Sequence, residues 1–290
     1  MFSIEPLSDI LGARITGLDL SGGVTQTDFN RALQALHEHG FIVLPRQTLT
    51  PAQFVAFSAL WGRPEPHVID TYHHPADANI LILSNVYRDG KPIGLVDAGT
   101  YFHTDYSYLD IPARCTILHA LQVPHGREGT TQGTTHGTTF ANQRQAYQDL
   151  PEKMKRRIEG LVGRHHYGNR DDLDETSRTV ASVLTLDQKK KVTWVHHRIA
   201  RPHPHTGMKA LYAVSGSSFG IEGIDDGEAR TLLDELKAHA TQPRYLYTHE
   251  YAVGDVIVWD NAQLLHSAPL THCSEARTLW RITIKESART

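Results

Sequence analysis

Residues 256–266 read VIVWDNAQLLH, and this stretch decides the fold class. The segment VIVWD is apolar and rich in β-branched and aromatic residues, which predicts a buried strand. Only a short connection follows before the histidine at position 266. We therefore expect the chain to turn back at once and to bring His266 over the mouth of a barrel.

Other strand-like runs lie on both sides of this stretch, and few helical segments separate them. The expected strands are residues 14–20, 40–44, 79–86, 113–123, 191–197, 209–214, 245–251, 255–259 and 278–284, and the expected helices are residues 26–37, 51–61, 151–161 and 227–240. Regular crossover helices are missing from this order. The pattern predicts a mainly β protein, an antiparallel barrel or jelly roll with peripheral helices.

Length and composition limit the function classes. A chain of 290 residues with 40% hydrophobic and 21% charged residues fits a soluble globular protein, and we expect one domain over residues 1–290. The net charge of −3 disfavours nucleic acid as a partner. No apolar run approaches ~20 residues and the start, MFSIEPLSD, does not resemble a signal peptide, so we expect a cytoplasmic protein without a membrane partner. The oligomeric state, including a homo-oligomer, stays open.

The cysteine and histidine counts disfavour a metal site made of thiolates and allow one made of histidines. The two cysteines, Cys115 and Cys273, exclude a disulfide framework and disfavour a thiolate site, and we expect both to be buried. Histidine, present 19 times, is the commonest metal-ligating side chain. Spacing must decide which histidines bind a metal.

His103-Thr-Asp105 places two ligand-type side chains at positions i and i+2, which share a face on a strand. Alone, the triplet also fits a surface pair at a strand end. His266 supplies a third ligand, and two histidines with one carboxylate form the facial triad of non-haem Fe(II) oxygenases. That triad leaves three metal positions open, as oxygen chemistry requires.

Two arginines follow His266 in the expected strand RTLWRITI. Strand alternation puts Arg277 and Arg281 on one face, and two inward arginines are costly unless each meets an anion. The planar guanidinium suits the far carboxylate of a 2-oxo acid. The alternative is a pair of ordinary surface charges on an edge strand.

The sequence resembles the taurine dioxygenase and 2,4-dichlorophenoxyacetate dioxygenase family. The segment DGKPIGLVDAGTYFHTDYSYLDIPARCTILHALQVP resembles its metal-binding region, and VGDVIVWDNAQLLHSAP with the arginine pair resembles its C-terminal signature. GARITGLDLS and ALWGRPEPH extend the likeness over nearly the whole chain.

The resemblance implies a double-stranded β-helix with His103, Asp105 and His266 as ligands of Fe(II) and as the catalytic centre. It implies that Arg277 binds the far carboxylate of the cosubstrate 2-oxoglutarate, and that O2 is the oxidant. It further implies that Arg281 and His67 hold an anionic group of the substrate. His67 is also compatible with an ordinary loop residue after Pro66.

The family binds 2-oxoglutarate with a threonine as well, and here the chain departs from the family pattern. Residues 129–139, GTTQGTTHGTT, repeat Gly-Thr-Thr and predict an extended surface loop. Alignment on Phe140 selects Thr138 for this role, while Thr130 and Thr131 stay open.

The implied reaction hydroxylates a small anionic substrate and releases succinate and CO2. Sulfonates, alkyl sulfates, aryloxyalkanoates and other carboxylates are candidate substrates, and hydroxylation beside sulfur or oxygen would cleave the C–S or C–O bond. Four aromatic residues beside the ligands, Tyr101, Phe102, Tyr106 and Tyr108, are candidates to line the apolar part of the substrate site, although some belong to the core by strand alternation.

Two other function classes compete. Residues 216–220 fit G-x-S-x-G, so a serine hydrolase would use Ser218, then Asp255 or Asp260, then His266. A metal-binding module without catalysis would keep the triad but have no need for Arg277. Iron-dependent turnover of 2-oxoglutarate separates the three classes.

The histidine pairs 73–74, 165–166, 196–197 and 203/205 show no acidic partner at a defined spacing, so we expect them to be solvated or structural.

Overall fold

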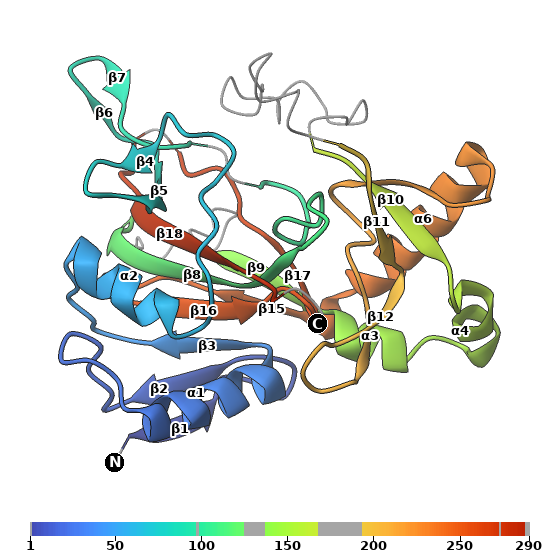
Figure 1. Cartoon of the computed structure of the whole chain (residues 1–290), viewed down its shortest axis with the longest axis horizontal. Helices are drawn as coiled ribbons and strands as arrows, with labels where there is room; N and C mark the ends of the chain where they lie inside the picture. Colours follow the sequence, from blue (N-terminus) through green and yellow to red (C-terminus); the bar gives the residue numbers. More distant parts are fainter. Residues whose placement is uncertain (1, 97–98, 125–136, 168–192, 273, 288–290) are drawn as a thin grey trace.

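The computed structural model describes residues 2–96, 99–124, 137–167, 193–272 and 274–287. Its largest element is an eight-stranded sheet with the order β1-β2-β3-β16-β8-β18-β5-β4 (Figure 1). These strands are β1 (Ser3–Pro6), β2 (Ala13–Thr16), β3 (Phe41–Leu44), β16 (Val256–Asp260), β8 (Ala113–Gln122), β18 (Thr278–Lys285), β5 (Asp77–Ser84) and β4 (His73–His74). Only β2 and β3 pair in parallel within this sheet. The expected mainly β architecture is confirmed for the described part of the chain.

The segment VIVWD forms β16 near the middle of this sheet. β16 pairs with β3 on one side and β8 on the other, and all five of its residues are buried. A strand covered on both faces has no polar alternation, which explains its continuous apolar run. β16 thereby fixes the point at which the chain turns toward His266.

A smaller antiparallel sheet packs across one face of the large one. It consists of β15 (Leu246–His249), β9 (Thr138–Asn142) and β17 (Leu264–Ser267). Phe41 of β3 stacks on Phe140 of β9 with ring centroids 4.5 Å apart, inside an apolar cluster that both sheets share. The space between the two sheets receives side chains from β8, β17 and β18.

Two helices cover the opposite face of the large sheet (Figure 1). α1 (Gln26–His39) is capped by Thr25, and α2 (Pro51–Ala59) begins with a capping box in which Thr50 and Gln53 bond each other's backbone N–H. Phe29, Leu36 and Phe54 from these helices are buried in the apolar cluster beneath them. Both helices were predicted from the sequence.

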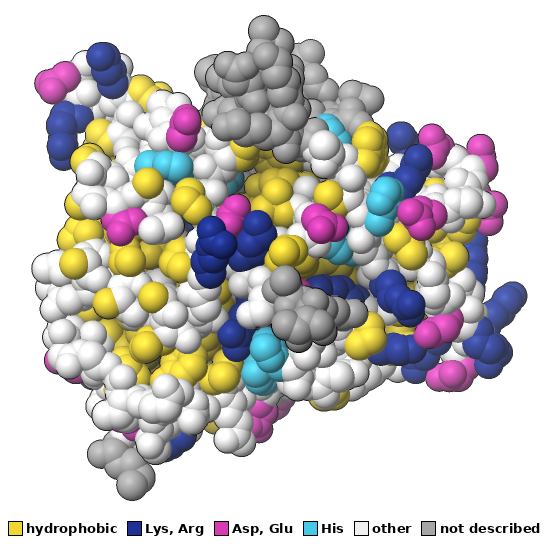
Figure 2. All heavy atoms as spheres, viewed as in Figure 1, with side chains coloured by type: hydrophobic (Ala, Val, Ile, Leu, Met, Phe, Trp, Pro, Cys, Tyr) yellow, Lys and Arg dark blue, Asp and Glu magenta, His cyan; other side chains and the backbone are white. Residues whose placement is uncertain are grey.

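A second group of elements carries most of the remaining helices (Figure 1). It contains α3 (Gln143–Gln148), α4 (Glu152–Ile158), α6 (Asp226–Ala240), the 3-10 helix η3 (Pro243–Tyr245), and the strands β10 (Val162–His165), β11 (Val195–Arg198), β12 (Ala200–Pro202), β13 (Lys209–Leu211) and β14 (Ser218–Ile221). Figure 2 shows acidic and basic side chains interspersed over α4 and α6, where Arg157 lies 3.4 Å from Glu235. This face presents mixed charge, not a basic stripe.

Several expected boundaries were wrong for local backbone reasons. The strand expected over residues 14–20 ends at Thr16 because Gly17 has φ +86°, and the strand expected over residues 209–214 ends at Leu211, before Ala213 at φ +47°. The helix expected to reach residue 161 ends at Ile158, before Gly160 at φ +77°. η3 replaces the start of the strand expected over residues 245–251.

A tight turn at Asp89-Gly90 joins β6 (Tyr87–Arg88) to β7 (Lys91–Pro92). Cys115 is fully buried, as expected. The expected loop 129–139 is partly wrong, because Thr138 and Thr139 belong to β9. Cys273, residues 125–136 and the start of the strand expected at 191 lie outside the described residues. None of the helices described is long and apolar enough to cross a membrane.

His165 yields a prediction about acid stability. Its ring is buried on β10, and burial, then the neighbouring His197 and His196, lower its pKa to about 3. The unfolded chain takes up a proton near the ordinary value of about 6.5, so stability is complete above pH 6.5 and falls as the pH decreases toward 3. In urea titrations, His165→Leu should flatten this pH profile by up to about 1.4 kcal/mol per pH unit. Parallel profiles for both proteins would contradict the assignment.

Candidate active site

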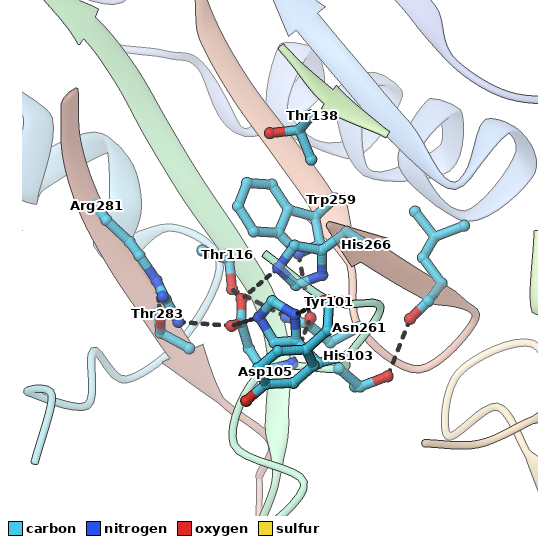
Figure 3. Close-up of polar contacts among 12 residues, drawn as sticks. Tyr101, His103, Asp105, Thr116, Thr138, Trp259, Asn261, His266, Arg281 and Thr283 are labelled. Atoms are coloured by element: carbon cyan, nitrogen blue, oxygen red, sulfur yellow. Dashed lines mark hydrogen bonds and ion pairs between the residues drawn. The ribbon is translucent and has the colours of Figure 1, made fainter. Parts of the chain in front are cut away.

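His103 and His266 are held side by side by the backbone. The N–H of each residue donates to the carbonyl of the other at 2.9 Å, which joins the segment around His103 to β17. The prediction that His103 and Asp105 lie on a regular strand was wrong: His103 makes a single bridge, and a turn begins at Asp105. The turn nevertheless directs both side chains toward His266 (Figure 3).

The donor atoms of these three residues form a compact group. His103 Nε2 lies 3.6 Å from Asp105 Oδ1, and His266 Nε2 lies 3.6 Å from Asp105 Oδ2. His103 Nδ1 donates to the carbonyl of Tyr101 at 2.9 Å, so its Nε2 carries the lone pair. Two imidazole nitrogens and one carboxylate are the donor set of a non-haem Fe(II) site, so the residues fit that metal.

The charge of the group is set by its burial and by its neighbours. Burial alone would raise the pKa of Asp105, but the Arg281 guanidinium, His266 and His103 hold that pKa well below its usual range. Burial and then His103 lower the pKa of His266 to about 3. Asp105 is therefore an anion and His266 is neutral at physiological pH, the states that a metal cation requires.

Arg281 binds Asp105 directly. Its Nη2 donates to Asp105 Oδ1 at 2.7 Å and its Nε donates to Thr283 Oγ1 at 3.2 Å (Figure 3). We expected the buried guanidinium to need an anion, and it has one, but that anion is the side chain of Asp105. The expectation that the substrate supplies the anion for Arg281 was therefore incomplete, because Asp105 already supplies one.

Arg277 and Thr138 line one pocket together with Arg281, His266 and Trp259. Arg277 is partly exposed, yet its Nε is enclosed without a hydrogen-bond partner, and burial lowers the pKa of its guanidinium. Within the described residues it forms no ion pair, and its guanidinium carbon lies 5.7 Å from the centroid of the Tyr251 ring. Thr138 Oγ1 lies 2.5 Å from the hydroxyl of Tyr251. Thr130 and Thr131 lie outside the described residues.

His67 lies in the electrostatic field of Arg281 and Asp105. Burial and then Arg281 lower the pKa of His67 to about 3, so the imidazole is neutral. Its Nδ1 accepts the N–H of Ile69 at 3.1 Å, and the remaining proton therefore resides on Nε2. His67 offers one N–H donor.

The aromatic residues near the ligands divide between core and site. Tyr106 and Tyr108 are buried, and the rings of Tyr108 and Tyr167 pack in a tilted arrangement with centroids 4.5 Å apart. The three phenols lie close enough to Arg281 to influence the pKa of its guanidinium. Tyr101 lies against His103, whereas Phe102 packs on the apolar cluster near α6.

His37, His203 and Asp260 form a second group with metal-ligand chemistry. His203 Nδ1 accepts the N–H groups of His205 and Thr206, so the proton resides on Nε2, which donates to Asp260 Oδ2 at 2.8 Å. A protonated Nε2 cannot bind a metal. The group is structural, although the expectation that His203 lacks an acidic partner was wrong.

The serine-hydrolase alternative does not match the geometry. Ser218 begins β14, which pairs with β10, and α6 starts only at Asp226. Asp255 bonds His249 and Asp260 bonds His203, while the carboxylate near His266 is that of Asp105. A nucleophile elbow needs a strand, a sharp turn and an immediate helix, and this segment has no such sequence of elements.

Sequence reasoning missed two residues that contact the ligands, Thr116 and Asn261. Thr116 Oγ1 donates to Asp105 Oδ2 at 2.6 Å, and Asn261 Nδ2 donates to Thr116 at 3.0 Å. A threonine inside an apolar strand and an asparagine in a turn give no local signal of such a role. Only the register of β8 beside β16 brings them to Asp105.

Comparisons with known proteins agree with this geometry. The profile described as "Taurine catabolism dioxygenase TauD, TfdA family" matches residues 3–283. The alpha-ketoglutarate-dependent 2,4-dichlorophenoxyacetate dioxygenase of Cupriavidus pinatubonensis is 30% identical over 98% of both chains. Pentalenolactone F synthase of Streptomyces arenae is 28% identical over 94% of this chain and 91% of its own.

A solved structure shows the same likeness. The crystal structure of AAD-2 in complex with Mn(II) and N-oxalylglycine superposes with a TM-score of 0.82 and 28% identity, covering 99% of this chain and 98% of the other. The family profile spans nearly the whole sequence, and both relatives match over more than nine tenths of their own length. The chain therefore belongs to the TauD/TfdA family of dioxygenases.

Proposed function

We propose that this dioxygenase hydroxylates a small anionic organic substrate at an iron bound by His103, Asp105 and His266, within a double-stranded β-helix. The enzyme uses Fe(II), 2-oxoglutarate and O2. One observation carries the assignment: a group of two histidines and a carboxylate lies beside a pocket that Arg277 also lines, and the Nε of this arginine has no hydrogen-bond partner among the described residues. A hydrolase or a passive metal site needs no such cation.

In the proposed site, one set of residues binds the metal and another binds 2-oxoglutarate. When bound, Fe(II) and 2-oxoglutarate activate O2, and the oxo acid leaves as succinate and CO2 while the substrate is oxidised. His103, Asp105 and His266 would hold the metal with two imidazole nitrogens and one carboxylate, a donor set that leaves room for the cosubstrate. Arg277 pairs with the far carboxylate of 2-oxoglutarate, and Thr138, on the same pocket, donates its hydroxyl to that carboxylate.

Arg281 and His67 receive the anionic group of the substrate. Nε and Nη2 of Arg281 are engaged by Thr283 and Asp105, and the guanidinium has further N–H groups on Nη1. His67 adds the N–H on Nε2. The phenyl rings of Tyr106, Tyr108 and Tyr167 offer apolar surface next to this cation.

The relatives support an organic acid as the substrate. Besides the 2,4-dichlorophenoxyacetate enzyme, a relative from Sphingobium herbicidovorans is named (S)-phenoxypropionate/alpha-ketoglutarate-dioxygenase and is 28% identical over 98% of this chain. Sulfonates, alkyl sulfates and aryloxyalkanoates all present an anion near a C–S or C–O bond. Hydroxylation at the carbon next to the heteroatom would release a carbonyl product and cleave that bond.

The metal assignment is tested with His103→Ala and Asp105→Ala. Each variant loses one of three protein ligands, so we expect Mn²⁺ binding, followed by electron paramagnetic resonance, to disappear together with 2-oxoglutarate turnover. Chelation of the wild type should abolish turnover, and added Fe²⁺ should restore it. Ser218→Ala is the matched control and should keep both properties. Full activity of metal-free protein, or its loss in Ser218→Ala alone, would refute the proposal.

The role of Arg277 is tested with Arg277→Gln and Arg277→Lys. Leaving the far carboxylate buried and unpaired should cost about 2–5 kcal/mol in apparent 2-oxoglutarate affinity. The lysine variant keeps the charge without the planar fork, so it should lie between Gln and wild type. Mn²⁺ affinity should not change. A variant that raises the KM of the organic substrate alone would reverse the assignment.

The charge of the substrate is tested by comparing an acid with its neutral amide in assays of succinate formation. Wild-type enzyme should strongly prefer the acid. Because Arg281 also holds Asp105, His67→Leu is the cleaner variant. Loss of a hydrogen bond to a charged group costs about 1.5–3 kcal/mol, so we expect a KM for the acid roughly ten- to hundred-fold higher, with little change for the amide. His196→Leu, at an exposed position, is the control. Equal wild-type turnover of acid and amide would contradict the proposal.

A further inference from the structure

We propose that Thr116 and Asn261 are positioning residues that orient the carboxylate of Asp105 for metal binding. Both side chains are fully buried, and neither belongs to the ligand set. The inference rests on the proposed function in one respect, namely that Asp105 is a metal ligand. It adds a hydrogen-bonded chain that runs from β16 through Asn261 and Thr116 to Asp105 (Figure 3).

The direction of each hydrogen bond in this chain is determined by its partners. Asn261 Oδ1 accepts from Trp259 Nε1 at 3.1 Å and from the backbone N–H of Asp105 at 3.3 Å. Both partners are donors, so this atom must be the amide oxygen, and the Nδ2 group therefore faces Thr116. Thr116 Oγ1 accepts from Nδ2, and its own proton goes to Asp105 Oδ2 at 2.6 Å.

Asn261 thus holds the main chain of Asp105 while Thr116 holds its side chain. The two residues come from strands that are neighbours in the large sheet, since Thr116 lies on β8 and Asn261 directly follows β16. The N–H of Asn261 donates to the carbonyl of Arg114 on β8 at 3.0 Å, which ties the turn to that strand. The turn that contains Asp105 is thereby fixed to β8 and β16 in the interior of the sheet.

The two carboxylate oxygens of Asp105 have different donors. Arg281 donates to Oδ1 and Thr116 donates to Oδ2, and each oxygen also lies 3.6 Å from the Nε2 of one histidine. The terminal torsion of an aspartate has a broad energy profile, so without specific donors the carboxylate would rotate between several orientations. The two donors select one orientation and leave lone pairs on the oxygens for a metal.

The experiment measures Mn²⁺ affinity of the full-length, metal-free protein. Thr116→Val removes the hydroxyl with little change in shape, and loss of a residue that orients a metal ligand typically weakens metal binding about 10–100-fold. Thr116→Ser restores the donor and should return to within a few-fold of wild type. Thr139→Val is the matched control, because Thr139 bonds Thr248 and alternates away from Thr138 on β9.

A double-mutant cycle tests whether the two residues act as one chain. Asn261→Ala should weaken Mn²⁺ binding as well, and the double variant with Thr116→Val should lose much less than the two single effects combined. Thermal unfolding of the metal-free proteins separates this loss from a general loss of stability.

If Thr116→Val does not fold, Asn261→Ala alone carries the test. Mn²⁺ affinities equal to wild type in folded variants, with Asp105→Ala inactive in binding, would overturn the inference but not the proposed function. Retained binding in Asp105→Ala would overturn the proposed function itself.

Discussion

The buried negative charge of Asp105 is the constraint on which the rest of the site depends. A carboxylate that is 3% exposed is costly unless it is matched by cations and hydrogen-bond donors. Here Arg281 comes from β18 and Thr116 from β8, while His266 comes from β17 of the smaller sheet. The groups that accommodate this charge thus come from both sheets. The packing of the smaller sheet on the large one therefore provides the electrostatic environment of the ligands as well as their positions.

Arg281 shows how a correct physical rule can still leave the partner undetermined. A buried guanidinium needs an anion, and alternation along β18 correctly directs Arg281 inward to the pocket that Arg277 also lines. Asp105 lies 176 residues away in sequence, and no local pattern connects the two. In the proposed function Arg281 serves two anions, the iron ligand through Nη2 and the substrate through Nη1. The planar guanidinium permits this division, because its N–H groups point in separate directions.

The sequence predicts those parts of the structure whose signal is local. VIVWD forms a buried strand because its β-branched and aromatic side chains suit a strand that is covered on both faces. The Thr50-Pro51 pair marks the start of α2, because Thr50 caps the helix and Pro51 fits its first position. β9 has no such signal, since Thr138 and Thr139 belong to a Gly-Thr-Thr repeat and become a strand only by pairing with β15 and β17. The resemblance to a family, not the spacing, selected Thr138.

The same limit applies to the site. His103, Asp105 and His266 could be proposed together because their residue types and order match one donor set, although the backbone around Asp105 is a turn and not the expected strand. The acidic partner of His203 could not be foreseen, because Asp260 is 57 residues away and the contact arises from the packing of a turn on β16. Thr116 and Asn261 were missed for a similar reason. Hydrogen-bonded chains across strands depend on register, which a single sequence does not display.

The charges in the site also bear on the substrate. His67 and His266 are neutral, so among the described residues that form the ligand group or line its pocket, the ionised side chains are those of Asp105, Arg277 and Arg281. With Fe(II) and the two carboxylates of 2-oxoglutarate in place, the positive charges exceed the negative charges by one. A buried excess charge is unfavourable in a low-dielectric interior, and a monoanionic substrate cancels it. A neutral substrate would leave the excess unmatched. The proposed preference for a small organic anion thus follows from the charge of the whole site, and it holds even though Arg281 already has a partner in Asp105.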